Sequence, residues 1–163
     1  VGWGGVQFFE EYGACAAIAE YDNNSFVFIG LDTTTGDLGL RLAVLNHAWT
    51  SLVVDDPYDL VVRFDRRAPW DITMYGTNVQ GRPGLYNVFP ATSDSSGNFV
   101  REFQRSLNMV WTYRGTELGS FSLRGTNMAM NEVMACTEIY LDAMAPPSDP
   151  FAGGGAGKAD PFQ

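Results

Sequence analysis

One stretch of eight residues constrains the fold more than any other feature of the chain. Residues 38–45 read Leu-Gly-Leu-Arg-Leu-Ala-Val-Leu, so large apolar side chains recur at every second position. Successive side chains of a β-strand point to opposite faces, and this period of two therefore predicts a strand with one buried face. Residues 58–65 show the same alternation. The chain is thus expected to build a sheet with one apolar side.

Other short segments have the composition of strands and are bounded by turn residues. Residues 15–21 and 25–31 are separated by Asp22-Asn23-Asn24 and predict a hairpin. Further strands are expected at residues 70–75, 107–113 and 118–123. Residues 99–104 fit either a strand or a helix. Residues 76–84 and 94–97 are rich in Gly, Pro, Asn and Ser and are expected to be loops.

A single helix is expected at the C-terminal end, with Thr126 as its N-cap and residues 127–144 as its body. About eight to ten strands followed by one helix predict a mainly β fold, an antiparallel β-sandwich or barrel with the helix covering a face or an end. We expect residues 1–145 to form one domain and residues 146–163 an extended tail. The predicted core-facing stripe of the helix consists of Met130, Val133, Met134, Thr137 and Leu141.

The two cysteines, Cys15 and Cys136, lie near the two ends of the expected domain. A bond between them would close a loop of about 120 residues, worth about 4–5 kcal/mol in a chain-entropy estimate. We therefore expect a disulfide that fastens the C-terminal helix to the first core strand. Two unconnected buried thiols are the alternative. A nucleophilic Cys15 paired with His47 is disfavoured, because no hydrolase motif surrounds either residue.

The chain starts at Val1 rather than at methionine. If this start is natural, a signal peptide has been removed and the compartment is oxidising, so we expect a periplasmic or extracellular location. A chain trimmed at this point by other means would read the same. No apolar run approaches the roughly 18 residues of a membrane-spanning helix, so no transmembrane segment is expected.

The charge of the chain disfavours nucleic acids and anionic lipids as partners. The formal net charge is −9, and there are ten basic residues. Binding to phosphates requires a concentrated positive patch. The densest basic cluster, residues 63–67, is interrupted by Asp65 and lies along an expected strand, which is typical of a solvated face. We expect no nucleic-acid partner.

No group of residues has the spacing of a catalytic or cofactor site. His47 is the only histidine, which excludes a multi-histidine metal centre and leaves one possible histidine base. Acidic pairs such as Asp32 with Asp37 and Asp55 with Asp56 fit turn chemistry better than a calcium loop. We therefore expect no catalytic residue, no metal and no cofactor.

Two alternatives remain for the aromatic and acidic residues. Trp3, Trp49 and Trp70 lie in or beside expected loops and could bind a carbohydrate, a peptide or a small ligand in the mouth of a sandwich or barrel, although filling the core is the favoured interpretation. A hydrolase or sugar-acting enzyme could use carboxylates of the 76–97 region, provided that two of them lie within about 10 Å of each other.

One segment of the chain has a pattern that is similar to a known protein family. It reads Leu118-Gly-Ser-Phe-Ser-Leu-Arg-Gly125 and is followed by Thr-Asn-Met-Ala-Met130 and by Cys136. It resembles the invasion-associated locus B family of small secreted proteobacterial proteins, in which a final strand of this form runs into a short Ala-rich helix. Residues 38–64 are similar to that family's middle strands. The chain lacks the family's closely spaced cysteine pairs and adds a tail. The resemblance implies an exported β-rich domain without known catalysis, and it assigns no functional residue.

The tail, PPSDPFAGGGAGKADPFQ, contains the unit Asp-Pro-Phe twice. Its composition predicts a flexible extension. In each unit the proline extends the chain, the Phe can enter a pocket and the Asp can meet a donor, and two linked units can reach adjacent sites with a gain in effective concentration. A tail without any partner is the alternative. The predicted partner-binding residues are Asp149, Pro150, Phe151, Asp160, Pro161 and Phe162.

The missing catalytic pattern, the acidic charge and the tail together predict a function. We expect a non-enzymatic exported protein that acts by binding, as an accessory subunit of a larger assembly. The tail would engage either another protein or a second copy of this chain in a homo-oligomer.

Overall fold

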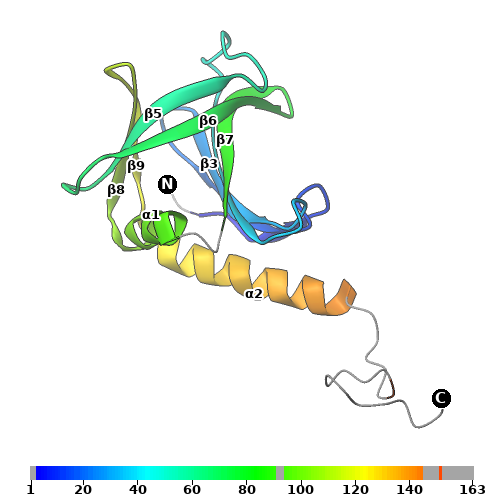
Figure 1. Ribbon diagram of the computed structural model, residues 1–163. Coiled ribbons are helices and arrows are strands. Elements are labelled where there is room, and N and C mark those ends of the chain that lie inside the picture. Colours follow the sequence, from blue (N-terminus) through cyan, green and yellow to red (C-terminus); the bar gives the residue numbers. More distant parts are fainter. Residues whose placement is uncertain (1–2, 91–93, 145–150, 152–163) are drawn as a thin grey trace.

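A computed structural model of the chain describes residues 3–90, 94–144 and 151. Within these residues nine strands form one antiparallel sheet, and two helices lie at one end of it (Figure 1). The elements are β1 (Gln7–Phe9), β2 (Ala14–Glu20), β3 (Ser25–Asp32), β4 (Gly39–Asn46), β5 (Pro57–Phe64), β6 (Trp70–Val79), β7 (Arg82–Pro90), α1 (Asp94–Arg105), β8 (Asn108–Tyr113), β9 (Thr116–Ser122) and α2 (Thr126–Met144).

The strands follow the order β1-β2-β3-β4-β7-β6-β5-β8-β9 in the sheet. The sheet is strongly curved around its concave face, as Figure 1 shows, and it is not closed into a barrel. The predicted mainly β fold with a C-terminal helix is therefore confirmed, and all nine described strands belong to one sheet.

The concave face of the sheet carries the main core. Along β4, Leu40, Leu42 and Val44 lie in this core, whereas Arg41 and Ala43 lie on the convex face. This is the alternation that the sequence predicts for a half-buried strand. The largest fully buried side chains of the described residues are Trp111, Phe64, Phe103, Phe121 and Ile29.

One end of the concave face is covered by the two helices, and we call it the helix end. Phe99 of α1 lies with its ring centroid 5.2 Å from that of Phe64 and 5.4 Å from that of Phe89, and Phe103 is fully buried. The expectation of a loop at residues 94–97 is wrong, because α1 begins at Asp94. Phe99 and Phe103, four residues apart, place one apolar face against the sheet.

The expectation of a loop at residues 76–84 is also wrong. β6 continues to Val79, β7 starts at Arg82, and the two-residue turn between them has φ angles of 51° at Gln80 and 83° at Gly81. Both values are those of a tight hairpin turn. Gly76 serves a different purpose, because a Cβ there would lie 2.0 Å from the Val53 carbonyl oxygen. A glycine in a strand can mark such a close approach rather than a turn.

A disulfide joins α2 to the sheet, as the sequence predicts. Cys15 of β2 is bonded to Cys136 with their Cα atoms 5.9 Å apart, and the Cys15 N–H donates to Thr137 Oγ1 at 3.1 Å. The predicted N-cap is not made by Thr126, whose hydroxyl donates to the Leu123 carbonyl at 2.6 Å within a buried site. α2 is thus attached to β2 by one covalent bond and one hydrogen bond near its middle.

Tyr21 connects parts of the sheet that are far apart in strand order. It follows β2, and its hydroxyl donates to the Ser122 carbonyl of β9 at 2.7 Å. Its ring packs edge-on against Phe121 with centroids 5.0 Å apart. Burial raises the pKa of Tyr21 to about 12. This contact helps to bring the two sides of the curved sheet together without backbone pairing between them.

Candidate functional site

The end of the concave face opposite the helices is covered by residues 47–56, which we call the 47–56 loop. It connects β4 to β5, and β7 and β6 lie between these strands in the sheet. The loop must therefore cross the end of the sheet. Three hydrogen bonds hold it there: Asp55 N–H to the Gly76 carbonyl at 2.8 Å, Gly76 N–H to the Asp56 carbonyl at 2.9 Å, and Val53 N–H to the Tyr58 hydroxyl oxygen at 2.9 Å.

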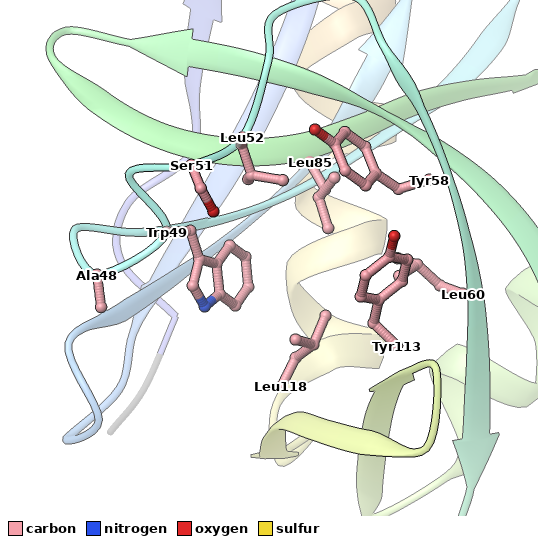
Figure 2. Close-up of a pocket in the computed structure, with 9 residues that line it drawn as sticks. All are labelled: Ala48, Trp49, Ser51, Leu52, Tyr58, Leu60, Leu85, Tyr113 and Leu118. Carbon is pink, nitrogen blue, oxygen red and sulfur yellow. The ribbon is translucent and has the colours of Figure 1, made fainter.

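A pocket of about 210 Å³ lies beneath this loop, and we call it the aromatic pocket (Figure 2). Its walls come from the loop and from four strands, β5, β7, β8 and β9. None of the lining side chains is charged. They are Ala48, Trp49, Ser51, Leu52, Tyr58, Leu60, Leu85, Tyr113 and Leu118.

The lining side chains divide into an apolar base and an aromatic rim. Leu60 and Leu85 are each only 2% exposed and belong to the core. The rings of Tyr58 and Tyr113 meet edge to face with centroids 5.9 Å apart. Figure 2 shows Trp49 presented by the loop on the other side of the pocket. Of these side chains, only Trp49 is identified in the sequence as a candidate for ligand binding. The convergence of the others depends on the path of the loop across the sheet.

The tryptophans expected in or beside loops are half-buried and pack against the main core. Trp70 also donates its indole N–H to the Glu102 carboxylate of α1. The favoured interpretation, that these rings fill the core, therefore agrees with their packing. Trp49 has a second role as a wall of the aromatic pocket.

A second exposed apolar region lies on α2. The helix packs on β1, β2, β3 and α1, and its last turns project past the strands (Figure 1). Of the predicted core-facing stripe, Met130, Val133 and Thr137 are buried, but Met134 and Leu141 are more than 40% exposed. That part of the stripe prediction is wrong: Met134 lies at the edge of a pocket that α2 shares with α1 and β4, and Leu141 lies in the last two turns, beyond the buried part of the stripe. With Ile139 and Tyr140, these two side chains form what we call the apolar patch of α2.

The apolar patch is supported from one side by the N-terminal strand. The rings of Phe8 and Tyr140 are stacked with centroids 4.3 Å apart and planes 13° apart. Ile139 is 67% exposed. Of the predicted partner-binding residues, Phe151 is described and is 49% exposed. Asp149, Pro150, Asp160, Pro161 and Phe162 lie outside the described residues.

The histidine and one of the acidic residues considered as catalytic or metal-binding candidates form hydrogen bonds or an ion pair with neighbouring residues. His47 Nε2 accepts from Arg82 Nε at 3.2 Å in an exposed position. Asp32 is buried, forms an ion pair with Arg41 at 3.1 Å and accepts from the N–H of Thr34 at 2.8 Å. In residues 76–97 the only carboxylate is that of Asp94. Within the described part of the chain, no three His, Cys, Asp or Glu side chains group together as metal ligands.

Neither of the two helices that the structure describes has the length and apolar character required to cross a membrane. Comparisons with protein-family models, with curated proteins and with solved structures found no match. The two candidate regions are therefore interpreted from their own chemistry.

Proposed function

We propose that this chain is an exported, non-enzymatic binding protein that serves as an accessory subunit of a larger assembly. It engages a partner protein through the apolar patch of α2 and the segment that follows, including the two Asp-Pro-Phe units. The observation that carries this proposal is the exposure of Ile139, Tyr140 and Leu141 in the last two turns of the helix, with Met134 exposed nearer its middle.

Scattered apolar side chains on a surface are ordinary, but a group of them on one element is typical of an interaction site. Within about two turns of the helix, Met134 and Leu141 share one face at the i, i+7 spacing, Tyr140 stacks on Phe8, and Ile139 lies on another side. A partner groove would therefore enclose this end of the helix rather than receive a single apolar stripe. The disulfide at Cys136 lies between Met134 and Ile139 and fixes the helix to β2. A surface held in this way loses little conformational freedom on binding.

The charges around the patch indicate the chemistry of the partner. α2 carries three acidic residues, Glu132, Glu138 and Asp142, and no basic residue. The following segment adds two acidic residues, Asp149 and Asp160, and one basic residue, Lys158. An apolar groove bordered by Lys or Arg would complement this surface, whereas a second copy of the chain, with a net charge of −9, would bring like charges together. We therefore favour a different protein over a homo-oligomer.

Export is supported by the bonded cysteine pair. Disulfides form and persist in oxidising compartments and are rare in reducing ones. The described cysteines, Cys15 and Cys136, are both in the disulfide. A periplasmic or extracellular partner therefore fits the proposal best.

The proposal is tested by placing a photo-crosslinking amino acid at Ile139 in cells of the source organism. Met128 is the matched control, because it lies on the same helix and is 68% exposed against 67% for Ile139. We expect one defined adduct from position 139 and none from position 128. The partner in that adduct, once purified, should bind the wild-type chain at least tenfold more tightly than the Ile139→Glu variant.

Three crosslinking outcomes would contradict the proposal. They are the absence of an adduct at position 139, the same adduct from position 128, and an adduct that contains only a second copy of this chain. A purified partner whose affinity is unchanged by Ile139→Glu would contradict it as well.

A further inference from the structure

We propose that the aromatic pocket is a binding site for a small, flat, mainly apolar molecule that carries one uncharged polar group, such as a hydroxyl. This site lies at the opposite end of the sheet from the helices and is independent of the partner surface on α2. The inference rests on the volume of the pocket, on the rigidity of its walls and on the kinds of side chain that line it.

The volume of the pocket limits the size of its ligand. An apolar cavity of about 150 Å³ is large enough to bind benzene, and sites for drug-sized molecules occupy about 300–1,000 Å³. The aromatic pocket, at about 210 Å³, falls between these values. A molecule of one or two fused rings would fit it, whereas a folded peptide segment or a long lipid chain would not be contained.

The walls of the pocket are held in place before any ligand arrives. Both the N–H and the carbonyl group of Gly76 in β6 form hydrogen bonds with the backbone of the 47–56 loop. The Tyr58 hydroxyl oxygen also accepts a hydrogen bond from Val53 N–H at 2.9 Å. Trp49 is fixed at its own backbone, since its N–H donates to the Asn46 carbonyl at 3.1 Å. A site that is already formed binds a ligand without the cost of ordering a loop.

The lining favours a ring over a charged group. Leu60 and Leu85 at the base offer only apolar atoms, and the rings of Tyr58 and Tyr113 offer an edge-to-face arrangement that a third ring can extend. None of the described side chains that line the cavity is charged, and Arg114, whose guanidinium lies 5.1 Å from the centroid of the Tyr113 ring, is not among them. A bare ionic group inside the cavity would therefore lose its hydration without a charged partner in the lining.

Two hydroxyl groups at the rim of the pocket are placed to form a hydrogen bond with one hydroxyl or carbonyl group of the ligand. The hydroxyls of Ser51 and Tyr113 make no hydrogen bond to the residues that the structure describes. Figure 2 shows both among the lining side chains. A ligand oxygen or O–H group at the rim can therefore be satisfied while the rest of the molecule is buried.

The test uses 2-naphthol as the probe, because it is flat, uncharged at neutral pH and carries one hydroxyl. We expect saturable one-to-one binding to the full chain by calorimetry. Backbone amide NMR shifts should be confined to the 47–56 loop and to the strands that line the pocket. A sodium naphthalene-2-sulfonate titration supplies the charged comparison and should give at least tenfold weaker binding.

Two variants locate the site. Leu118→Trp should fill the pocket and weaken 2-naphthol binding at least tenfold, and Trp49→Ala should weaken it by removing one wall. Leu107→Trp is the matched control, since Leu107 is 67% exposed and lies outside the pocket. Circular dichroism melts of each variant establish that it is folded before its affinity is compared.

The inference is overturned if 2-naphthol shows no saturable binding to the wild-type chain. It is also overturned if folded Leu118→Trp and Trp49→Ala both bind as the wild type does, or if the sulfonate binds as tightly as the naphthol. A tenfold gain in naphthol affinity on deletion of residues 146–163 would identify the chain's own tail as the occupant and would likewise overturn the assignment to a free small molecule.

Discussion

The aromatic pocket and the apolar patch of α2 both expose apolar side chains, but they do so in opposite shapes. The pocket is concave, and its base leucines are almost completely buried. The patch lies on a projecting helix, and Ile139 is 67% exposed. A concave site can surround a small molecule, whereas a projecting one can only enter a depression on something larger. The two regions have similar residue types, but their shapes assign them different roles: the pocket is suited to a small molecule and the patch to a larger partner.

The two regions also differ in what holds them in place. The pocket is roofed by a loop that depends on backbone hydrogen bonds around Gly76. α2 is held by the Cys15–Cys136 bond, with the Phe8–Tyr140 ring pair further along the helix. Changes in one region should therefore leave the other largely intact, because the attachments share no residues.

The largest expected effect comes from removing the disulfide. In the Cys15→Ala/Cys136→Ala double variant, the unfolded chain is released from a loop closed across 121 residues. The chain-entropy estimate gives a loss of about 4–5 kcal/mol in the free energy of unfolding. For a chain of this size that corresponds to a fall of roughly 10–15 °C in the melting temperature, measured by calorimetry.

Adding dithiothreitol to this double variant supplies the control and should cause no further change. Below the melting temperature, the 2-naphthol affinity of the pocket should equal that of the wild type. A loss of stability under about 1 kcal/mol, or a pocket that fails together with the helix, would break the comparison between independent regions.

A smaller effect is expected at the other end of the sheet. In Gly76→Ala the new Cβ would lie 2.0 Å from the Val53 carbonyl oxygen, so the 47–56 loop must move away from β6. Overpacking of this kind costs about 1–3 kcal/mol, which urea denaturation would measure. The affinity for 2-naphthol should fall as well, while crosslinking from Ile139 stays unchanged.

Gly5→Ala is the matched control, because a Cβ at Gly5 would meet no atom within 4 Å. Its stability should stay within about 0.5 kcal/mol of the wild type. An unaltered pocket in Gly76→Ala would show that the loop is not fixed by this close approach.

A pH effect is expected where Tyr21 joins β2 to β9. Because burial raises the pKa of Tyr21 to about 12 from its ordinary value of 10.0, the folded state favours the neutral phenol. The resulting stability is fully present below pH 10 and is lost as the pH rises from about 10 towards about 12. Urea midpoints at pH 8.5 and 11 should therefore differ more for the wild type than for Tyr21→Phe.

Tyr75→Phe provides the control for this measurement, since Tyr75 is 37% exposed. It should retain the pH dependence of the wild type. If the urea midpoint changes equally between pH 8.5 and 11 in all three proteins, the effect does not come from Tyr21. A changed 2-naphthol affinity in Tyr21→Phe would link this contact to the aromatic pocket.

The sequence predicts the parts of the fold that follow from local alternation and from covalent spacing. Residues 38–45 alternate because one face of β4 meets the core, and the cysteine pair limits where α2 can lie. The loop assignment of residues 76–84 failed because glycine has two uses. At Gly81 it permits a turn, whereas at Gly76 it permits contact with Val53.

Apart from Trp49, which the sequence suggests as a possible ligand-binding residue, the walls of the aromatic pocket could not be predicted, for a related reason. Its walls come from segments separated by as many as 70 residues, such as Ala48 and Leu118, and they meet only because β4 and β5 are not neighbours in the sheet. Strand order is a long-range property that local periodicity does not encode. The exposure of Leu141 at the end of the predicted stripe was missed similarly, since helical spacing cannot show how far the helix extends past the elements that cover it.

The smallest effect on stability is expected at the apolar patch itself. Ile139→Ser replaces a side chain that is 67% exposed, so the free energy of unfolding should change by less than about 0.5 kcal/mol. Val133→Ser, on the same helix but fully buried, should lose about 2 kcal/mol or more, because it removes a core side chain and buries a hydroxyl. Both are measured by urea denaturation. Because the substitution at the exposed position should leave stability nearly unchanged, a weakened partner interaction in Ile139→Ser reports the surface directly. A loss of stability at Ile139 comparable to that at Val133 would mean instead that the patch packs against this chain.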